Sequence, residues 1–376
     1  MRIADIEVWV VNVPLTTTFS STVDRHDGTT RTVLRIRTTD GREGWGETMH
    51  GRPTATLVRK LAPEFIGSDP RAVRMILSRQ RMVPFFYGYI GYCALAGLEM
   101  AMLDLCCRSW DVPLHLYLGG AFRSRIPITA LLTTGAAGAT PDSELPQELA
   151  RIGAREVAEH GFTALKFKGS FDPAFDVRVM AALRAALPTL PLRVDPNAAW
   201  SVNASIRAAQ QLEEIGLEYL EDPCAGIEGM ARVADSTRIP LCTNMCVVEP
   251  DHIAPAVRAG AVDIVHADVH KWGGVLPTMD LYAACAAFGL GVNFHSGGEL
   301  GISTACHLHV AAAFPRLDHA IDSTYYLAAE DVLTDRIAFS GGALTVPEGP
   351  GLGVDVDPGR LTEAARRNEI EGDHTP

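Results

Sequence analysis

Three oxygen-bearing residues follow short apolar runs and could together hold a divalent cation. Asp195 occurs in Val-Asp-Pro-Asn, Glu221 in Leu-Glu-Asp-Pro and Asn244 in Cys-Thr-Asn-Met. Carboxylate and amide oxygens are the ligands that Mg2+ prefers, and the two carboxylates would neutralise the ion. Any one such residue alone is more often a helix cap or a solvated loop residue. Three of them at the ends of successive apolar runs favour a magnesium site with open positions for a substrate.

Two lysines lie one step before this set, in Leu-Lys-Phe-Lys-Gly. Lys166 and Lys168 are two residues apart, so on a strand both side chains point to the same face. If that face is the interior, we expect each ammonium group to lower the pKa of the other by like-charge repulsion, which would make a neutral base accessible. The alternative is a surface strand with Leu165 and Phe167 in the core. The place of the lysines in the series favours the interior.

A histidine and an aspartate end two further apolar runs. His295 stands in Asn-Phe-His-Ser-Gly-Gly and Asp268 in His-Ala-Asp-Val-His. On adjacent strands, the Asp268 carboxylate could bind one imidazole nitrogen, fix its tautomer and support the imidazolium form. A lone histidine near a core strand is usually structural. Beside a metal site and a lysine base, His295 becomes a candidate acid.

The elements that must position these residues form a regular series. Short β-branched runs alternate with helical segments from about residue 126, and seven polar strand ends from residue 168 to residue 322 follow one another at intervals of 23 to 27 residues. One βα unit of a TIM-like barrel has about this length, and its active site lies at the carboxyl ends of the strands. The expected strands are 126–134, 164–168, 192–195, 219–221, 241–244, 264–268, 292–295 and 320–323.

A different pattern precedes the barrel. Alternating runs at residues 2–15 and 32–37 predict an antiparallel sheet, and helical periodicity follows at 54–65 and 91–108. We therefore expect an α+β capping domain at residues 1–125 and a (β/α) barrel at 126–336. A hairpin within 337–346 is expected to return to the amino-terminal sheet, so that residues 337–376 complete the capping domain.

Composition excludes some partners. The formal net charge is −12 and basic residues form no long run, which disfavours nucleic acid. The amino-terminal residues do not have the pattern of a signal peptide, and the longest apolar stretch, near residues 92–107, is interrupted by acids, which disfavours a membrane span. The eight cysteines include no Cys-x-x-Cys pair, which favours reduced thiols and a cytoplasmic protein.

The motifs together resemble the enolase superfamily, its mandelate racemase-like branch and, within that, the glucarate dehydratase group. The resemblance runs through Lys-Phe-Lys-Gly, Asp-Pro-Asn-Ala-Ala-Trp, Glu-Asp-Pro-Cys, Thr-Asn-Met, Ala-Asp-Val-His-Lys-Trp and Pro-Gly-Leu-Gly-Val. It implies a modified (β/α)7β barrel and Mg2+ as cofactor. Asn244 is the discriminating third ligand, because most relatives place Glu or Asp there. Asp268 stands where cycloisomerases and dipeptide epimerases carry a lysine, which disfavours those activities.

The resemblance also implies roles for the site residues. Lys168 would be the base on one face of the substrate α-carbon, Lys166 would contact the substrate carboxylate, and Asn197 would hydrogen-bond nearby. His295, paired with Asp268, would work on the other face and protonate the leaving β-hydroxyl. The product from an acid sugar would be a 2-keto-3-deoxy acid. Homo-oligomers are common in this family, so we expect one here.

Substrate choice is expected from capping-domain loops near residues 19–28 and 47–52. By resemblance His26 would bind substrate, and the further candidates for its distal group are Arg25, Arg31, His50 and Arg52. Two positions depart from the family pattern. Gly297 replaces an expected asparagine, and the distal arginine expected after the eighth strand has only the late Arg336 as a counterpart.

Two other functions remain open at this stage. A base on each face of the α-carbon could racemise or epimerise a 2-hydroxy acid without losing water. A non-catalytic barrel that binds a metal or an acid ligand would instead show a broken ligand or base set, and none of the residues of these sets is missing.

Overall fold

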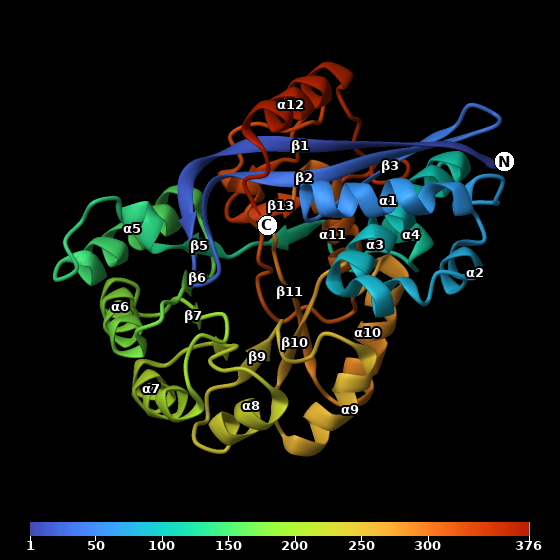
Figure 1. Cartoon of the computed structure of the whole chain (residues 1–376). Coiled ribbons are helices and arrows are strands. Elements are labelled where there is room, and N and C mark those ends of the chain that lie inside the picture. Colours follow the sequence, from blue (N-terminus) through green and yellow to red (C-terminus); the bar gives the residue numbers. More distant parts are fainter. Residues whose placement is uncertain (376) are drawn as a thin grey trace.

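The structure is a computed structural model that describes residues 1–375. It contains a capping domain with an antiparallel sheet and a second region with a parallel sheet surrounded by helices (Figure 1). The elements of the first region are β1 (Ile3–Ser20), β2 (Arg25–Thr38), β3 (Glu43–Thr48), α1 (Gly51–Phe65), α2 (Val73–Ser78), α3 (Val83–Trp110) and α4 (Leu114–Tyr117).

The parallel sheet has the order β11-β10-β9-β8-β7-β6-β5. Its strands are β5 (Ala130–Leu132), β6 (Leu165–Lys168), β7 (Leu192–Asp195), β8 (Tyr219–Glu221), β9 (Leu241–Thr243), β10 (Ile264–Ala267) and β11 (Gly291–Phe294). The helices between them are η1 (Thr134–Ala137), α5 (Leu145–His160), α6 (Pro173–Ala186), α7 (Val202–Ile215), α8 (Ile227–Ala234), α9 (Pro250–Ala259) and α10 (Val275–Ala287), and α11 (Gly301–Ala313) follows β11. The expected α/β barrel of the enolase type is confirmed.

The expected eighth strand at 320–323 closes the barrel without forming a regular strand. Ile321 makes a single parallel bridge to Ile128. The amide of Asp322 donates to the Phe294 carbonyl at 3.1 Å, and the amide of Thr129 donates to the Ile321 carbonyl at 2.9 Å. These bonds join the two edges of the sheet, so Asp322 still lies at the carboxyl end of the barrel.

The hairpin near the carboxyl end has a different partner from the one expected. Strands β12 (Phe339–Ser340) and β13 (Ala343–Thr345) follow η2 (Tyr325–Leu327) and pair with β4 (Arg125–Pro127), not with the amino-terminal sheet. Leu344 pairs with Ile126, and both side chains are fully buried, which gives this small sheet its own apolar centre. The expected domain boundary at residue 126 falls inside β4. The last helix, α12 (Pro358–Glu371), packs on β1 (Figure 1).

Close packing of α3 on the amino-terminal sheet depends on glycines in Gly-Trp-Gly-Glu. A Cβ at Gly44 or Gly46 would lie 2.3 Å from a carbonyl oxygen of α3, so larger residues would push the helix away. The helix α3 is long and apolar enough to cross a membrane by length and composition, but 89% of its apolar window is buried inside the protein. These features identify α3 as a core helix.

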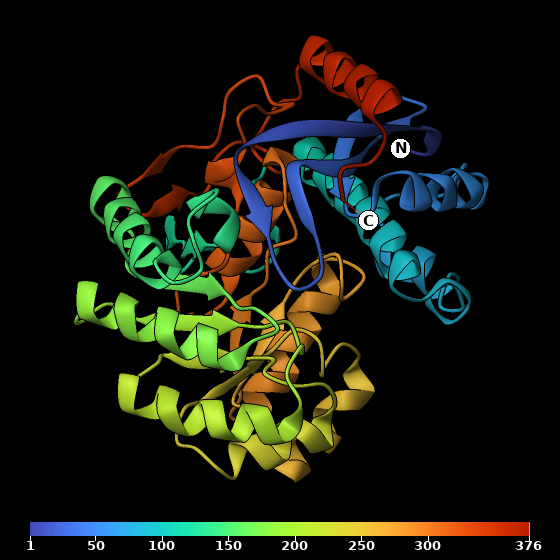
Figure 2. The ribbon, with the colours of Figure 1, turned by 60° about the vertical axis from the view of Figure 1, so that its left-hand side comes forward.

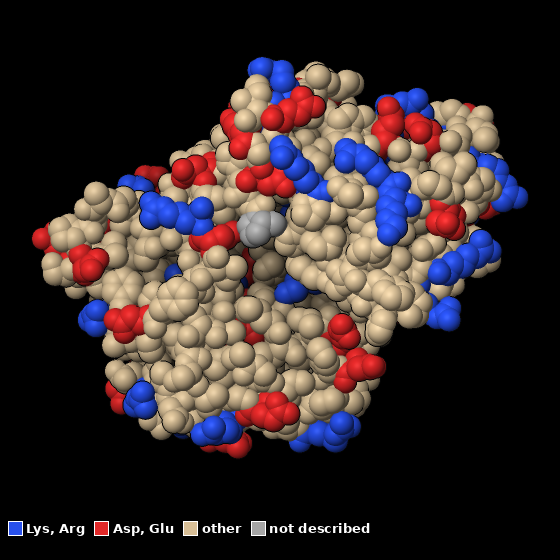
Figure 3. Space-filling view, in the orientation of Figure 1, with Lys and Arg blue, Asp and Glu red and all other residues tan. Residues whose placement is uncertain are grey.

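The capping domain reaches the carboxyl ends of the barrel strands through the β1–β2 hairpin, which bends down toward the barrel (Figure 2). The Thr22 hydroxyl donates to the Pro196 carbonyl at 2.9 Å, and the Thr29 hydroxyl donates to the Gly298 carbonyl at 2.9 Å. The expected closure of the 19–28 loop over the barrel is therefore present. Acidic and basic side chains are interspersed on the face shown in Figure 3, without a basic stripe.

Candidate active site

A cavity of about 250 Å³ lies between the capping domain and the barrel mouth. The barrel contributes five of the polar side chains singled out from the sequence or its spacing: Lys166, Lys168, Asn197, His295 and Asp322. The capping domain contributes the polar side chains of His26, Arg31 and His50 and the apolar side chains of Phe19 and Met49, among others. Residues at the ends of four barrel strands, from the closing segment at 320–323 and from two capping-domain loops thus meet in one space.

Both lysines point into the barrel, as expected from their spacing. Lys168 Nζ lies 2.5 Å from Asp195 Oδ2 and 3.4 Å from Asn197 Oδ1. Lys166 Nζ lies 2.7 Å from Glu221 Oε2 and 2.5 Å from Asp322 Oδ2. Asn197 has a left-handed backbone with φ of 53°, and its backbone N–H donates to Asp195 Oδ1 at 2.9 Å. Asp195 is therefore held from both sides.

The expected depression of the lysine pKa by like charge is wrong for Lys166. Burial disfavours its charge, but the carboxylates of Asp322, Glu221 and Asp195 outweigh burial and hold the pKa well above its usual range. Repulsion from one lysine is smaller than attraction to three carboxylates within 3.4 Å. Lys166 therefore carries a fixed positive charge, which suits contact with an anionic substrate.

The three expected metal ligands converge. Asp195 and Glu221 both direct an oxygen at Lys166 Nζ, at 3.4 Å and 2.7 Å, and Asn244 Nδ2 donates to Glu221 Oε1 at 2.9 Å. All three side chains are buried. Burial and the neighbouring Asp195 charge raise the pKa of Glu221 to about 8. A cation beside these carboxylates would relieve that repulsion.

The oxygen donor set fits Mg2+. Asp222, the remaining acid of Glu-Asp-Pro, accepts from the Thr243 hydroxyl at 2.6 Å and from the Asn244 amide at 2.7 Å, so it shapes the loop instead of offering a ligand. Lys271 Nζ donates to the Asn244 carbonyl and lies 3.4 Å from its side-chain oxygen. The ion would be held by Asp195, Glu221 and Asn244, with the amide of Asn244 turned to present its oxygen.

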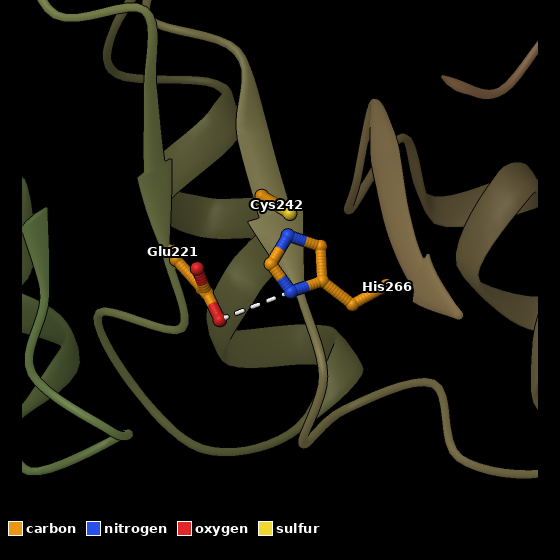
Figure 4. A group of neighbouring side chains, drawn as sticks. All are labelled: Glu221, Cys242 and His266. Atoms are coloured by element: carbon orange, nitrogen blue, oxygen red, sulfur yellow. Dashed lines mark ion pairs between the residues drawn. The ribbon is translucent and has the colours of Figure 1, made fainter. Parts of the chain in front are cut away.

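A second group of potential ligands lies beside Glu221 (Figure 4). His266 Nδ1 is 3.4 Å from Glu221 Oε1, and the Cys242 sulfur lies next to the imidazole. Burial lowers the pKa of His266 well below its usual range and raises that of Cys242 well above it. A neutral imidazole and a protonated thiol are poor partners for Mg2+, so this group supports Glu221 instead of replacing the oxygen set.

The expected histidine pair is formed. His295 Nδ1 lies 3.1 Å from Asp268 Oδ2, and Asp268 Oδ1 accepts the His270 amide at 2.8 Å. Burial lowers the pKa of His295, and the hydrogen bond to Asp268 opposes that shift. The imidazole is therefore neutral at rest, and Asp268 favours its protonated form, as expected from the sequence.

The candidates for substrate recognition separate into two groups. His26 lines the cavity and stacks on Phe19 at 5.0 Å, and Arg31 and His50 also line it. Arg25 is exposed and does not line the cavity, and Arg52 faces Asp373 instead. Arg336 donates to the carbonyls of Ala328 and Tyr325, so its role is structural.

Gly297 has a physical reason for its departure from the family pattern. A Cβ at this position would lie 1.6 Å from the terminal methyl group of Met49. The capping domain therefore fills the space that an asparagine side chain would need. The cavity wall here is apolar where the family pattern is polar.

Three residues of the site had no role predicted from the sequence. Asp322 was placed at a strand end by its spacing, but its ion pair with Lys166 was not expected. Lys271 lies within the quoted Ala-Asp-Val-His-Lys-Trp motif, but only the structure shows its contact with Asn244. Thr375 lines the cavity without any local signal in the sequence.

The chain belongs to the enolase superfamily, in its mandelate racemase and muconate lactonizing enzyme branch. Residues 5–119 match the mandelate racemase / muconate lactonizing enzyme N-terminal domain, and residues 148–360 match the enolase C-terminal domain-like family. The recognition made from the motifs is thereby confirmed.

The chain is similar in sequence to proteins with several different activities. A Streptomyces coelicolor protein named as a probable glucarate dehydratase is 38% identical, over 90% of this chain and 85% of its own length. Other relatives, at 25% to 30% identity, are cycloisomerases, a D-gluconate dehydratase and an L-Ala-D/L-Glu epimerase.

Solved structures agree over the whole fold. An enolase of Streptomyces coelicolor, provisionally assigned as a sugar isomerase, has a TM-score of 0.98 and 52% identity with full coverage of both chains. An enolase of Pseudomonas fluorescens with bound magnesium, potassium and tartrate has a TM-score of 0.87 and 30% identity, over 100% of this chain and 94% of its own. This chain is therefore an enzyme of the same superfamily.

Proposed function

We propose that this protein is a magnesium-dependent acid-sugar dehydratase of the glucarate dehydratase type, a hydro-lyase. The observation that carries the proposal is the meeting of Lys168 and His295 in one cavity. The buried Asp268 bonds His295 from behind the cavity wall, and the buried oxygen donors Asp195, Glu221 and Asn244 are linked to the two lysines. The relative named as a probable glucarate dehydratase supports it. The intact base and ligand sets disfavour a non-catalytic ligand-binding barrel.

In the proposed reaction, Lys166 binds the substrate carboxylate through its fixed positive charge. Lys168, in its neutral form, removes the proton from the α-carbon, and the electron pair moves into an enediolate. His295, neutral at rest, takes up a proton from solvent water, and both the negative charge of the enediolate and the Asp268 carboxylate stabilise the imidazolium that forms. The ammonium group of Lys168 later returns its proton to solvent. His295 then gives its proton to the β-hydroxyl, the carbon–oxygen bond breaks, and water leaves. Tautomerisation of the resulting enol gives a 2-keto-3-deoxy acid.

Bound Mg2+ would supply positive charge to the substrate carboxylate as the enediolate forms. Asn197 orients Lys168 and Asp195 through its two contacts. His26 is the proposed contact for the distal part of the substrate. We place the enzyme in the cytoplasm and expect a homo-oligomer; the eight buried free cysteines support a reducing compartment.

A racemase or epimerase acting on a 2-hydroxy acid is the second candidate. It would use the same enediolate, with a base on each side of the α-carbon, and the provisional isomerase assignment of the 52% identical structure favours it. The difference lies in whether His295 protonates the hydroxyl or the carbon.

The deciding experiment incubates the purified protein with Mg2+ and a panel of mono- and diacid sugars in deuterated water. A 2-keto-3-deoxy product from one acid, detected by colour reaction, supports the dehydratase. Deuterium at the α-carbon without loss of water, detected by NMR, overturns it in favour of the racemase or epimerase.

A further inference from the structure

The segment after α12 turns back over the capping-domain loops and reaches the cavity. The His374 amide donates to the Thr30 hydroxyl at 2.7 Å, and the Thr30 amide donates to the Thr375 hydroxyl at 3.3 Å. Asn12 Nδ2 donates to the Gly372 carbonyl at 2.7 Å. Thr375 and its neighbour Thr30 both line the cavity. Residues 372–375, called the strap, thus bring Thr375 into the cavity wall.

The strap also supplies the cap that helix α1 lacks. His50 is the first flanking residue of α1, but its side chain makes no capping bond, and the first turn contains no acid. Asp373 Oδ2 accepts the Arg52 amide at 3.0 Å, and the carboxylate lies 3.5 Å from the Arg52 guanidinium. A carboxylate at a helix N-terminus satisfies an unpaired N–H and interacts favourably with the helix dipole. The strap thereby holds the end of the 47–52 loop.

The capping carboxylate is itself positioned. Asn368 Nδ2, in the last turn of α12, donates to Asp373 Oδ1 at 2.8 Å and to the Gly372 carbonyl at 3.2 Å. Asn368 is buried, with 3% of its surface exposed. A buried amide that bonds both the backbone and the side chain of the strap fixes the direction in which the strap leaves the helix.

Two glycines make room for the strap on the specificity loops. A Cβ at Gly51, where φ is +30°, would lie 2.6 Å from Asp373 Oδ2. A Cβ at Gly28 would lie 2.8 Å from His374 Nδ1. Each expected specificity loop therefore has a residue without a side chain where the strap crosses it, and the strap contacts both loops at once.

We propose that the strap determines substrate specificity: Thr375 forms part of the wall that limits the distal end of the acid, and Asp373 is a positioning residue for Met49 and His50. This inference rests on the proposed function for the identity of the ligand. Met49 and His50 directly precede α1 and line the cavity, so the cap on α1 sets the place of both side chains. The residues that act on the α-carbon are not touched.

The test compares Asp373→Ala with a matched control, Asp69→Ala. Asp69 makes the same kind of contacts, accepting the Arg71 amide at 3.1 Å and its guanidinium, but it does not line the cavity. Hydrogen exchange of the peptide covering residues 47–58 is measured in the ligand-free full-length protein. Loss of a cap predicts exchange about fivefold faster in Asp373→Ala and no change in Asp69→Ala. Asp373→Asn keeps one acceptor and should give an intermediate rate.

Calorimetry with tartrate and Mg2+ gives a second reading that needs no turnover. We expect Asp373→Ala to bind tartrate about fivefold more weakly, because binding must now order the loop. If the panel yields a substrate, KM should rise by a similar factor while kcat stays within about twofold. Thr375→Val should also change KM for long acids more than for short ones.

The outcomes separate this inference from the dehydratase. Unchanged hydrogen exchange at residues 47–58 in Asp373→Ala overturns the proposed role of the strap, whatever reaction the enzyme catalyses. If the wild type binds no tartrate, the hydrogen-exchange comparison alone decides. Faster exchange with unchanged tartrate affinity overturns its role in specificity. If Asp373→Ala shows faster exchange and weaker tartrate binding but the wild type dehydrates no acid sugar, the strap's role in binding is supported and the proposed dehydratase activity is overturned.

Discussion

Arg31 Nη2 lies 2.9 Å from His270 Nε2, so a capping-domain side chain is hydrogen-bonded to the loop after β10. An arginine can only donate, and His270 therefore accepts at Nε2 and carries its hydrogen on Nδ1. The same guanidinium donates to the Gly297 carbonyl at 2.9 Å and to Glu47 at 2.8 Å. Arg31 thus ties together the loops that follow Asp268 and His295.

Replacing Arg31 with lysine should lower kcat by roughly tenfold or more. A lysine carries its donors on a single nitrogen and cannot reproduce the planar fork that reaches three separate partners, and a small displacement of a catalytic pair is costly. Turnover and the pH profile of kcat are measured on the purified variant. The matched control is Arg35→Lys on the same strand, where Arg35 pairs with Glu7 and Glu43 away from the cavity. Equal kcat values and pH profiles in both variants would contradict the positioning of the histidine pair by Arg31.

Lys168→Ala and His295→Asn should each reduce turnover by about 10²–10⁴-fold while the protein remains folded, since each removes a group that transfers a proton. Circular dichroism and thermal unfolding check the fold, and product formation checks turnover. Lys60→Ala serves as the control, because Lys60 is an exposed residue of α1 that contacts Tyr87 outside the cavity. Full activity in either active-site variant would contradict the proton-transfer role assigned to that residue.

Magnesium should raise the melting temperature of the wild type in a concentration-dependent way, because an ion that binds only the folded state stabilises it. Asp195→Asn and Glu221→Gln should lose this shift, whereas Cys242→Ala should keep it. A thermal shift titration after treatment with a chelator measures the effect without turnover. Loss of the shift in Cys242→Ala, with retention in Asp195→Asn, would assign the ion to the group around His266 instead.

The barrel strands could be predicted because each leaves a local signal. A strand buried on both faces must be a short apolar run, and the functional residue must follow where the strand ends. Strands β7 and β8 accordingly match the expected ranges 192–195 and 219–221. The closing segment at 320–323 has the same apolar pattern but makes only one bridge. Ile321 exchanges two backbone hydrogen bonds with Pro127 and Thr129, which precede β5, and Asp322 makes one to Phe294 at the end of β11. Pattern alone does not distinguish these cases.

Contacts between distant segments left no such signal. The approach of Asp373 to Arg52 joins residues 321 positions apart, and that of Arg31 to His270 joins residues 239 apart. The direction of the Lys166 pKa also depended on such contacts, because Asp322 and Glu221 come from other strands. The spacing in the sequence placed these side chains at the carboxyl end of the barrel. Only the fold shows that attraction to the carboxylates outweighs repulsion between the two lysines.

Glu99 gives a prediction about stability that is independent of catalysis. This residue of α3 is fully buried, and it accepts the Leu276 amide at 3.3 Å. Burial raises its pKa from the ordinary value of 4.5 to about 8. Between these two values the folded protein keeps a proton that the unfolded chain releases, so the contribution of Glu99 to stability falls as the pH rises. Below about pH 4.5 Glu99 is protonated in both states and its ionisation does not destabilise the fold. Above about pH 8 it is ionised in both states and the full destabilisation by the buried charge is present.

Glu99→Gln should therefore unfold with a free energy that declines less between pH 5 and pH 8 than that of the wild type, because the amide keeps an acceptor for Leu276 and cannot ionise. Urea unfolding at several pH values across that window measures the difference. Glu64→Gln, at an exposed position of α1, is the control and should keep the wild-type slope. Other buried acids, such as Asp176 and Asp222, contribute to the slope of every variant, so the comparison rests on the change in slope. If Glu99→Gln and the wild type decline in parallel, Glu99 is ionised in the folded protein at neutral pH.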